Sequence, residues 1–277
     1  MTADADGWFE IRVSGARERN SVIAALFGAG SQAVQEVESD LVTWLAGNRA
    51  AEEVRTALRN ADPAAIVSII ATQPQSWNEW RARVCAHRLG TLTIAPPWLA
   101  ENLDPDRAVI IEPAMAFGTG EHATTRGVIR LMQTIPLEGL TIADLGAGSA
   151  ILSIAAAKLG ARRVVAIEID PDATTNAAEN VRANGVGDRV HFIEGDATTL
   201  LPLIAPVDVI LANILSSVLV GLLAVMRDSL AADGNAILSG ILREERAMML
   251  DAIEEKGWRL LKEDYEDEWW SGLIARA

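Results

Sequence analysis

Residues 141–172 constrain the fold more than any other part of this sequence, because they read as a strand, a glycine turn, a helix and a second strand. A short apolar run stops at Gly146-Ala147-Gly148, where the backbone can turn tightly and a ligand can approach without meeting side chains. Apolar periodicity predicts a helix from Ser149 to about Leu159, and residues 163–169 read as a buried parallel strand. Open α/β sheets bind ligands at the carboxyl ends of such strands. The stretch therefore predicts an α/β fold with a ligand at that edge.

Acidic residues at this edge favour a nucleoside that carries an amino group and a free ribose diol over one that carries a diphosphate. A dinucleotide fingerprint needs a third glycine where this chain has Ile151, and its diphosphate needs bare N–H groups at a helix N-terminus. Here Asp144 directly precedes the turn, and an acid beside the turn suits a ligand that carries an amino group. Glu168, near the end of the second strand, can accept both ribose hydroxyls. S-adenosylmethionine has these groups and no phosphate; a nicotinamide or flavin nucleotide and a purely structural turn are the alternatives.

The composition limits the partners that this chain can have. The net charge of −14 argues against a nucleic-acid backbone as partner, because phosphate binding needs a basic face. The charge favours encounter with a basic protein, or it serves solubility alone. Cys85 is the only cysteine, and the three histidines lack metal-ligand spacing, so neither a disulfide framework nor a metal site is expected. We see no signal peptide and no membrane span, and we expect a cytoplasmic protein.

Residues 1–72 have the pattern of a separate small domain. Their βαββαβ order is typical of a ferredoxin-like α+β fold and includes no catalytic constellation, which suits a binding or dimerisation module better than an enzyme. Residues 73–95, with Trp77, Trp80 and several arginines, are expected to form an ordered connector to a catalytic domain at 96–277. The predicted elements are a strand at 8–13, a helix at 17–27, two strands within 33–45, a helix at 50–58 and a strand at 65–71.

A short strand predicted at 109–111 leads into a polar, glycine-rich segment that precedes the core stretch. Gly118 and Gly120 flank Thr119, and hydroxyls follow at Thr124 and Thr125 ahead of a helix expected at 126–133. Such a segment can fold over a ligand as a lid, whereas a plain loop with a helix cap would need only one threonine. His122 is a candidate general base, and a hydrogen-bonded structural histidine is the alternative.

The remaining chain continues the alternation of strands and helices. Asp196 follows one predicted strand and Asn213 ends the next, so both belong to the ligand-binding edge. Residues 263–268 contain five acids, which we expect to form a solvated turn or to attract a lysine-rich target. The predicted elements are strands at 190–193, 207–212 and 234–240, a helix at 244–255, and an antiparallel hairpin of strands at 258–263 and 269–275.

Five blocks of this sequence, in the same order, resemble the PrmA family, which methylates ribosomal protein eleven of the large subunit. The resemblance implies a class I methyltransferase fold: a Rossmann-like, mostly parallel sheet closed by an antiparallel hairpin and preceded by a substrate-recognition domain. It also implies S-adenosylmethionine as cofactor. Ala150 stands where that family usually has a third glycine, and Ser216-Ser217-Val218 departs from its alanine-glycine-proline run. The blocks are 116–125, 144–149, 169–171, 213–215 and 239–242.

The resemblance assigns cofactor contacts to Thr125, Gly146, Glu168 and Asn213, and class I methyltransferases use an acid at the position of Asp196 to contact adenine. With the residues argued above, the predicted cofactor-binding set is Phe117, Gly118, Thr119, Gly120, Thr124, Thr125, Asp144, Gly146, Gly148, Glu168, Asp196 and Asn213.

We expect an enzyme that methylates lysine side chains, and also the N-terminal amine, of a large-subunit ribosomal protein. Asn213 would orient the amine through its carbonyl, and His122 would serve as an optional proton relay. No aromatic residue follows Asn213, which argues against a stacked, extruded nucleobase as acceptor. We expect a monomer that does not bind nucleic acid directly. The alternatives are the same fold acting on a small molecule or on another protein lysine, a binding scaffold that has lost catalysis, and a nicotinamide oxidoreductase.

Overall fold

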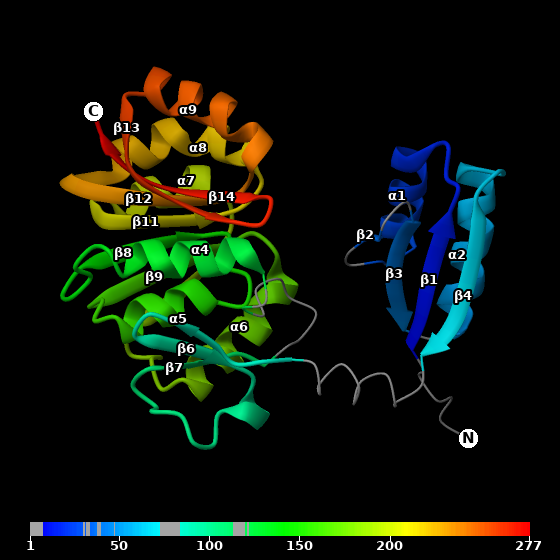
Figure 1. Cartoon of the computed structure of the whole chain (residues 1–277), viewed down its shortest axis with the longest axis horizontal. Helices are drawn as coiled ribbons and strands as arrows, with labels where there is room; N and C mark the ends of the chain where they lie inside the picture. Colours follow the sequence, from blue (N-terminus) through cyan, green and yellow to red (C-terminus); the bar gives the residue numbers. More distant parts are fainter. Residues whose placement is uncertain are drawn as a thin grey trace. The chain divides into compact units, whose positions relative to one another are not determined.

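The protein divides into two compact units, residues 1–84 and 85–277, each of which has its own arrangement of strands and helices (Figure 1). The structure is a computed structural model that describes residues 8–29, 31, 34–37, 40–46, 48–72, 84–112, 120 and 122–277. The predictions for Phe117, Gly118 and Thr119, and for most of the connector, lie outside the described residues.

The first unit is a four-stranded antiparallel sheet with two helices on one face. The sheet order is β2-β3-β1-β4, and every neighbouring pair is antiparallel. Alternate strand residues such as Ile11 and Leu41 point to one face and pack on Val22 of α1 and Leu58 of α2. The elements follow the order predicted from the sequence. They are β1 (Trp8–Ser14), α1 (Arg19–Gly28), β2 (Gln35–Val37), β3 (Asp40–Ala46), α2 (Asn48–Ala61) and β4 (Ile66–Thr72).

The second unit is built on a seven-stranded sheet in the order β10-β9-β8-β11-β12-β14-β13. Neighbouring strands are parallel except around β14, which is antiparallel to both β12 and β13. This architecture confirms the predicted α/β class, with its mostly parallel sheet and its antiparallel C-terminal hairpin. The strands are β8 (Thr141–Leu145), β9 (Arg163–Glu168), β10 (Val190–Glu194), β11 (Val207–Asn213), β12 (Leu230–Leu242), β13 (Trp258–Glu266) and β14 (Trp269–Arg276).

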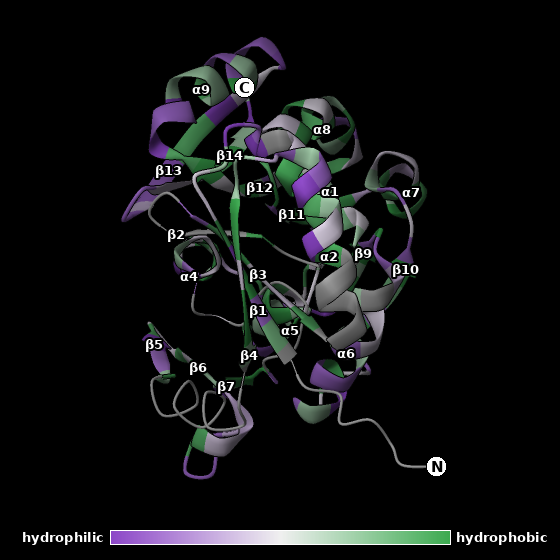
Figure 2. Cartoon of the chain, turned by 90° about the vertical axis from the view of Figure 1, so that its right-hand side faces the viewer, coloured by the Kyte–Doolittle hydropathy of each residue, from purple (hydrophilic) through white to green (hydrophobic). Residues whose placement is uncertain are grey.

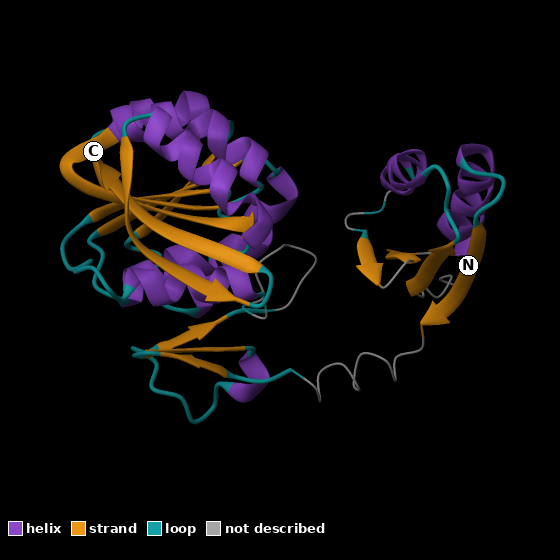
Figure 3. Ribbon diagram, turned by 45° about the horizontal axis from the view of Figure 1, so that its top comes forward, coloured by secondary structure: helices purple, strands orange, loops and turns teal. Residues whose placement is uncertain are grey.

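Helices cover both faces of this sheet, so that it lies between two apolar cores (Figure 3). Because side chains alternate along each strand, Ile142 packs in the core beneath α4–α6, whereas its neighbour Ala143 packs in the core beneath α7–α9. Figure 2 shows hydrophobic and hydrophilic residues on different faces of α9, as expected for a helix with one face on the sheet. The helices are α4 (Ala123–Met132), α5 (Ile151–Lys158), α6 (Pro171–Ala183), α7 (Ala197–Ile204), α8 (Ser216–Ser229) and α9 (Arg246–Glu255).

A second, three-stranded sheet precedes the large one in the chain. It consists of β5 (His87–Leu89), β6 (Leu92–Ala95) and β7 (Ala108–Ile110), and its apolar residues join the core beneath α4–α6. The sequence predicted β7 but not β5 and β6, whose residues lay in the expected connector. Strands of three and four residues are too short to show a clear period of two. The turn between them is marked by Gly90, whose φ is +59°.

Candidate functional site

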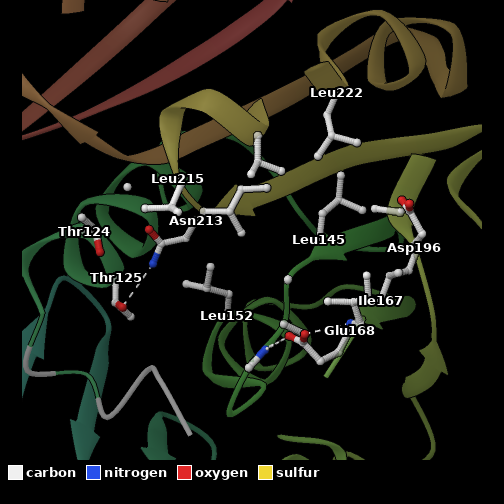
Figure 4. Close-up of a pocket in the computed structure, with 18 of the residues that line it drawn as sticks. Thr124, Thr125, Leu145, Leu152, Ile167, Glu168, Asp196, Asn213, Leu215 and Leu222 are labelled. Atoms are coloured by element: carbon white, nitrogen blue, oxygen red, sulfur yellow. Dashed lines mark hydrogen bonds between the residues drawn. The ribbon is translucent and has the colours of Figure 1, made fainter. Parts of the chain in front are cut away.

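A cavity of about 730 Å³ opens at the carboxyl edge of the large sheet. Its walls come from the ends of the central strand β8 and of its neighbours β9 and β11, where the strand order reverses direction. This is the position at which open α/β sheets bind ligands. Figure 4 shows Thr125 and Asn213 on one side of the cavity and Glu168 and Asp196 on the other. Further lining residues include Leu215, Val218, Gly221 and Leu222 of α8 and its entry, together with Gly240 and Trp269.

The glycine turn after β8 forms the floor of this cavity. Gly146 and Gly148 have φ of +70° and +51°, a region that favours glycine. The N–H groups of Gly146 and Ala147 donate to the carbonyl of Ile167 at 2.9 and 3.2 Å, which pins the turn to β9. A Cβ at Gly146 would lie 2.5 Å from Cγ2 of Ile214, so no side chain fits there. Ala150 keeps the left-handed conformation, with φ of +64°.

Glu168 faces the turn with both carboxylate oxygens fixed by backbone donors. Gly148 N–H donates to Oε2 at 2.8 Å, and the N–H groups of Ile169 and Asp170 donate to Oε1 at 2.8 and 3.0 Å. A carboxylate oxygen can accept more than one hydrogen bond. Glu168 is therefore held in place while retaining the capacity to accept hydroxyl groups of a ligand.

Asp144 lies inside the protein and is not among the residues that line the cavity. Ser153 Oγ donates to its Oδ2 at 2.6 Å, and its Oδ1 has no hydrogen-bond partner in the part of the chain that the structure describes. Burial raises the pKa of Asp144 to about 6, against the lowering effect of Ser153. Its carboxyl group thus lies close to the glycine turn in sequence but away from the ligand space.

Asn213 ends β11 with its amide at the cavity wall. Nδ2 donates to Thr125 Oγ1 at 3.4 Å, which orients the amide, and Oδ1 is buried without a partner among the described residues. Buried polar atoms normally have hydrogen-bond partners, and an exception calls for an explanation. A ligand or substrate donor in the cavity would supply the missing partner.

His122 and Trp269 contact each other, and both line the cavity. His122 caps α4: its Nδ1 accepts from Thr124 N–H at 3.4 Å and shares a 2.7 Å hydrogen bond with Thr124 Oγ1. The imidazole lies edge-on to Trp269, with ring centroids 4.9 Å apart. Burial, and then the nearby Arg126, lower the pKa of His122, which favours the neutral imidazole.

Asp196 caps the helix that follows β10. Thr198 donates to its Oδ1 from both N–H, at 2.7 Å, and Oγ1, at 2.8 Å, and these hydrogen bonds lower the pKa of Asp196. The residue also lines the cavity. The capping role and the ligand-facing position therefore coexist in one side chain.

Most of the predicted site residues in the described part of the chain come together around this cavity. Gly120 does not line it: a Cβ there would lie 2.5 Å from Cγ2 of Ile94 and 3.3 Å from Cδ1 of Ile151. The sequence predicts core and edge packing for Trp269 and Trp270, because spacing alone cannot show that the hairpin returns Trp269 to the start of α4. The predicted residues that line the cavity are His122, Thr124, Thr125, Gly146, Gly148, Glu168, Asp196 and Asn213.

The acidic segment before Trp269 is only in part the solvated turn that the sequence predicts: Asp267 and Glu268 are exposed in a turn, whereas the acids before them belong to β13. Asp264 pairs with Arg130 at 2.5 Å, and Glu266 pairs with Arg126 at 2.5 Å and with Arg130 at 2.7 Å. These pairs join α4 to β13, so the carboxylates of Asp264 and Glu266 serve the fold. In the described part of the chain, no helix has the length and apolar character needed to cross a membrane, and no cluster of potential ligands is suited to a metal ion.

Comparisons with known proteins converge on one group of enzymes. The family model described as ribosomal protein L11 methyltransferase (PrmA) matches residues 35–276. The ribosomal protein L11 methyltransferase of Geobacter sulfurreducens is 39% identical over 218 residues, covering 77% of this chain and 70% of that protein. The corresponding protein of Geotalea daltonii is 37% identical over 216 residues, covering 73% and 68%. The crystal structure of a ribosomal protein L11 methylase from Lactobacillus delbrueckii subsp. bulgaricus is similar with a TM-score of 0.62 at 32% identity, covering 70% of this chain and 99% of that one.

Proposed function

Since this chain belongs to the ribosomal protein L11 methyltransferase (PrmA) family, we propose that it transfers methyl groups from S-adenosylmethionine to amino groups of ribosomal protein L11. The observation that carries the proposal is Oδ1 of Asn213, which is buried and has no partner among the described residues, on the wall of a cavity whose opposite side presents Glu168. An acceptor amine can donate to the first of these groups, and a ribose diol to the second.

The residues of the cavity fit S-adenosylmethionine. The glycine turn presents bare backbone to the cavity, because Gly146 and Gly148 both line it and have no side chains for a nucleoside to meet. Glu168 would accept the ribose hydroxyls, and Asp196 would accept from the exocyclic amine of adenine. Asp144 would act through the turn, since burial keeps it off the cavity surface. When bound, S-adenosylmethionine supplies a methyl group that is already activated by the sulfonium charge.

The residues of the chain then mainly align the acceptor. Holding two reactants in the correct geometry contributes about 7–11 kcal/mol to such a reaction. Asn213 Oδ1 would accept a hydrogen bond from the amine and direct its lone pair away from the amide. Thr125 keeps that amide in one orientation through its hydroxyl.

The acceptor amine must be neutral in order to attack. A lysine in water has a pKa of about 10.4, and burial lowers it because the charged form loses its hydration. Leu215, Val218 and Trp269 give the cavity an apolar wall that would have this effect. His122 would serve as an optional relay for the proton that the amine releases. Its Nδ1 accepts from Thr124 N–H, so the neutral ring carries its proton on Nε2, and Nδ1 would take a further proton only by giving up that hydrogen bond. Because methylation keeps the charge of a lysine, repeated transfer to one nitrogen is chemically possible.

We propose lysine side chains as the main acceptors and the N-terminal amine as a further one. We also propose that residues 1–72, as a ferredoxin-like domain, recognise the protein substrate. The lack of a recognisable catalytic constellation in this unit supports a role in binding.

The test is to incubate the protein with radiolabelled S-adenosylmethionine and purified ribosomal protein L11, followed by mass spectrometry of the labelled band. We expect label on lysines of L11, and L11 whose amines have been acetylated is the matched control. Asn213→Ala should lower kcat about 100-fold, as removal of an oriented polar group at a reaction centre does. Label on a small molecule or on a different protein, with none on L11, would refute the proposed substrate.

A further inference from the structure

Two buried asparagines on one side of α6 hold backbone that leads to the cavity. Asn180 lies in α6 and Asn184 directly follows it, with 2% and 9% of their surfaces exposed. Four residues apart on a helix, two side chains point to the same side. Neither asparagine lines the cavity, so their amides act on other parts of the protein.

The first part of this arrangement is an amide ladder along β7 and the residues that follow it. Asn184 Oδ1 accepts from Ile110 N–H at 2.8 Å, and its Nδ2 donates to the carbonyl of Ile110 at 2.6 Å. Asn180 Oδ1 then accepts from Glu112 N–H at 3.0 Å. Ile111, between them, donates in the other direction, to the carbonyl of Ala95 on β6. The two side chains therefore act as the partner strand on the side of β7 that has no neighbouring strand in its sheet.

The second part is a hydrogen bond to the glycine turn, and of the two asparagines it is Asn180 that makes it. Asn180 Nδ2 donates to the carbonyl of Ser149 at 3.0 Å and to Asn176 Oδ1 at 3.3 Å. From the other direction, Glu168 Oε2 accepts from Gly148 N–H. The turn is thus held at successive residues by a carboxylate of β9 and an amide of α6, and both Gly148 and the nearby Ile151 line the cavity.

We propose that Asn180 is a positioning residue for S-adenosylmethionine: it fixes the carbonyl of Ser149, and through it the backbone on which the nucleoside rests. This inference rests on the proposed function. Its physical basis is that the buried amide uses its acceptor and both donors in hydrogen bonds, so that truncation leaves Glu112 N–H and the buried Ser149 C=O without these partners. A turn that relaxes to satisfy them moves away from the geometry that binds the ligand.

The test compares three variants on this helix in the full-length chain. Asn180→Ala removes the bond to the turn. Asn184→Ala removes a buried amide that bonds only Ile110 and the carbonyl of Asn180. Val181→Ala removes buried apolar contact, since Val181 is 5% exposed and packs in the core. Binding of S-adenosylmethionine is measured by calorimetry, and thermal unfolding of each variant without ligand gives its stability.

We expect all three variants to be less stable than the wild type, and only N180A to bind S-adenosylmethionine about tenfold more weakly, which corresponds to about 1.4 kcal/mol. In steady-state assays N180A should raise KM for S-adenosylmethionine with kcat within about twofold, so that saturating cofactor restores turnover. A loss of folded protein would instead lower kcat and leave KM unchanged. If N180A does not fold, Asn180→Leu, which has nearly the same shape, takes its place.

Equal affinities of N180A and N184A would overturn the positioning role, because the effect would then belong to β7 or to the helix as a whole. A wild-type chain that does not bind S-adenosylmethionine would instead contradict the proposed function itself. The two failures are distinguishable in one set of titrations.

Discussion

At the residue scale, the carboxylate of Glu168 is held in place by the backbone and can still accept hydrogen bonds from a ligand. Three backbone N–H groups, from Gly148, Ile169 and Asp170, already donate to its two oxygens. Both oxygens must therefore be acceptors, and any replacement that puts a donor at either position meets a backbone N–H group.

This requirement predicts the effect of Glu168→Gln. Whichever way the new amide turns, its NH₂ group faces a backbone N–H donor, so the hydrogen bonding at one of the two carboxylate oxygen positions is lost. We expect S-adenosylmethionine to bind at least about tenfold more weakly, measured by calorimetry. Glu194→Gln is the matched control, because Glu194 pairs with Glu168 in the sheet register but is exposed and does not line the cavity. Unchanged affinity in E168Q would exclude Glu168 from the binding site.

Asp144 predicts a dependence of stability on pH. Because burial raises its pKa in the folded state to about 6, above the usual value of about 3.9, the folded state loses stability as the pH rises through this window. Asp144→Asn removes the charge and keeps an oxygen for Ser153. We expect the free energy of unfolding at pH 8 to rise by about 1–3 kcal/mol, with no gain at pH 4.

Urea unfolding of both proteins at pH 4 and pH 8 measures this difference. The lower end of the expected gain in the free energy of unfolding allows for the cost of burying the NH₂ group of asparagine where a carboxylate oxygen of Asp144 lies. A variant that is less stable than the wild type at pH 8 would mean that the charged form of Asp144 is stabilised by the protein.

Several residues of the cavity could be predicted because their chemistry is visible in the sequence. Gly146, Glu168 and Asn213 occupy strand ends, and strand ends meet at one edge of a parallel sheet. The burial of Asp144 could not be predicted, since it depends on how α5 packs over β8. Trp269 was missed for a similar reason: its contact with His122 joins parts of the chain that only the folded hairpin brings together.

At the element scale, Ile214, which lies at the entry to α8, packs between Gly146 and Gly240. Ile214 follows Asn213, and its side chain occupies the space where a Cβ of Gly146 would lie. On the other side, a Cβ at Gly240 would collide with the backbone carbonyl of Ile214. The position of Asn213 therefore depends on the absence of a side chain at Gly240 of β12 and at Gly146 in the turn after β8.

We expect Gly240→Ala to lower the free energy of unfolding by at least about 2 kcal/mol, since φ of +83° is unfavourable for alanine and the Ile214 backbone must also move. Because Asn213 is displaced, kcat should fall by more than the loss of folded protein explains. Chemical unfolding and single-turnover kinetics measure the two effects.

Gly221→Ala provides the control within the same cavity wall. Gly221 lies inside α8, and a Cβ there would have nothing within 4 Å. Alanine at this position should raise stability by about 0.5–1 kcal/mol through helix propensity. A Gly240→Ala protein as stable and active as Gly221→Ala would contradict the close packing of Ile214 against Gly240.

The long, periodic elements of the fold were predictable, whereas the supporting sheet was not. The strands and helices of the large sheet have apolar patterns long enough to identify, and their alternation defines the class. β5 and β6 instead consist of three and four residues, and their pairing depends on β7. The tryptophans and arginines that precede them gave the segment the composition of a connector.

At the scale of the whole molecule, the two units have separate apolar cores. In the described residues, the core of the first unit uses side chains from residues 9–69, and the two cores around the large sheet use side chains from residue 89 onwards. The described residues that line the cavity all belong to the second unit. Binding of the cofactor and recognition of a protein substrate can therefore be tested separately.

A chain consisting of residues 85–277 should fold and bind S-adenosylmethionine with the affinity of the full protein. Its kcat/KM for ribosomal protein L11 should fall at least about tenfold, because the recognition unit is missing. Calorimetry and methylation assays on the two chains measure these quantities. Normal methylation of L11 by the shortened chain would refute the recognition role of the first unit.

The position of β14 has a consequence for how the enzyme is made in the cell. This strand follows β13 in the chain, yet it inserts between β12 and β13, which do not pair with each other. Until β14 has been synthesised, the apolar surface that Trp270 and Ile274 later cover has no strand over it. The nascent chain therefore passes through a state in which an incomplete sheet has to avoid association with other molecules.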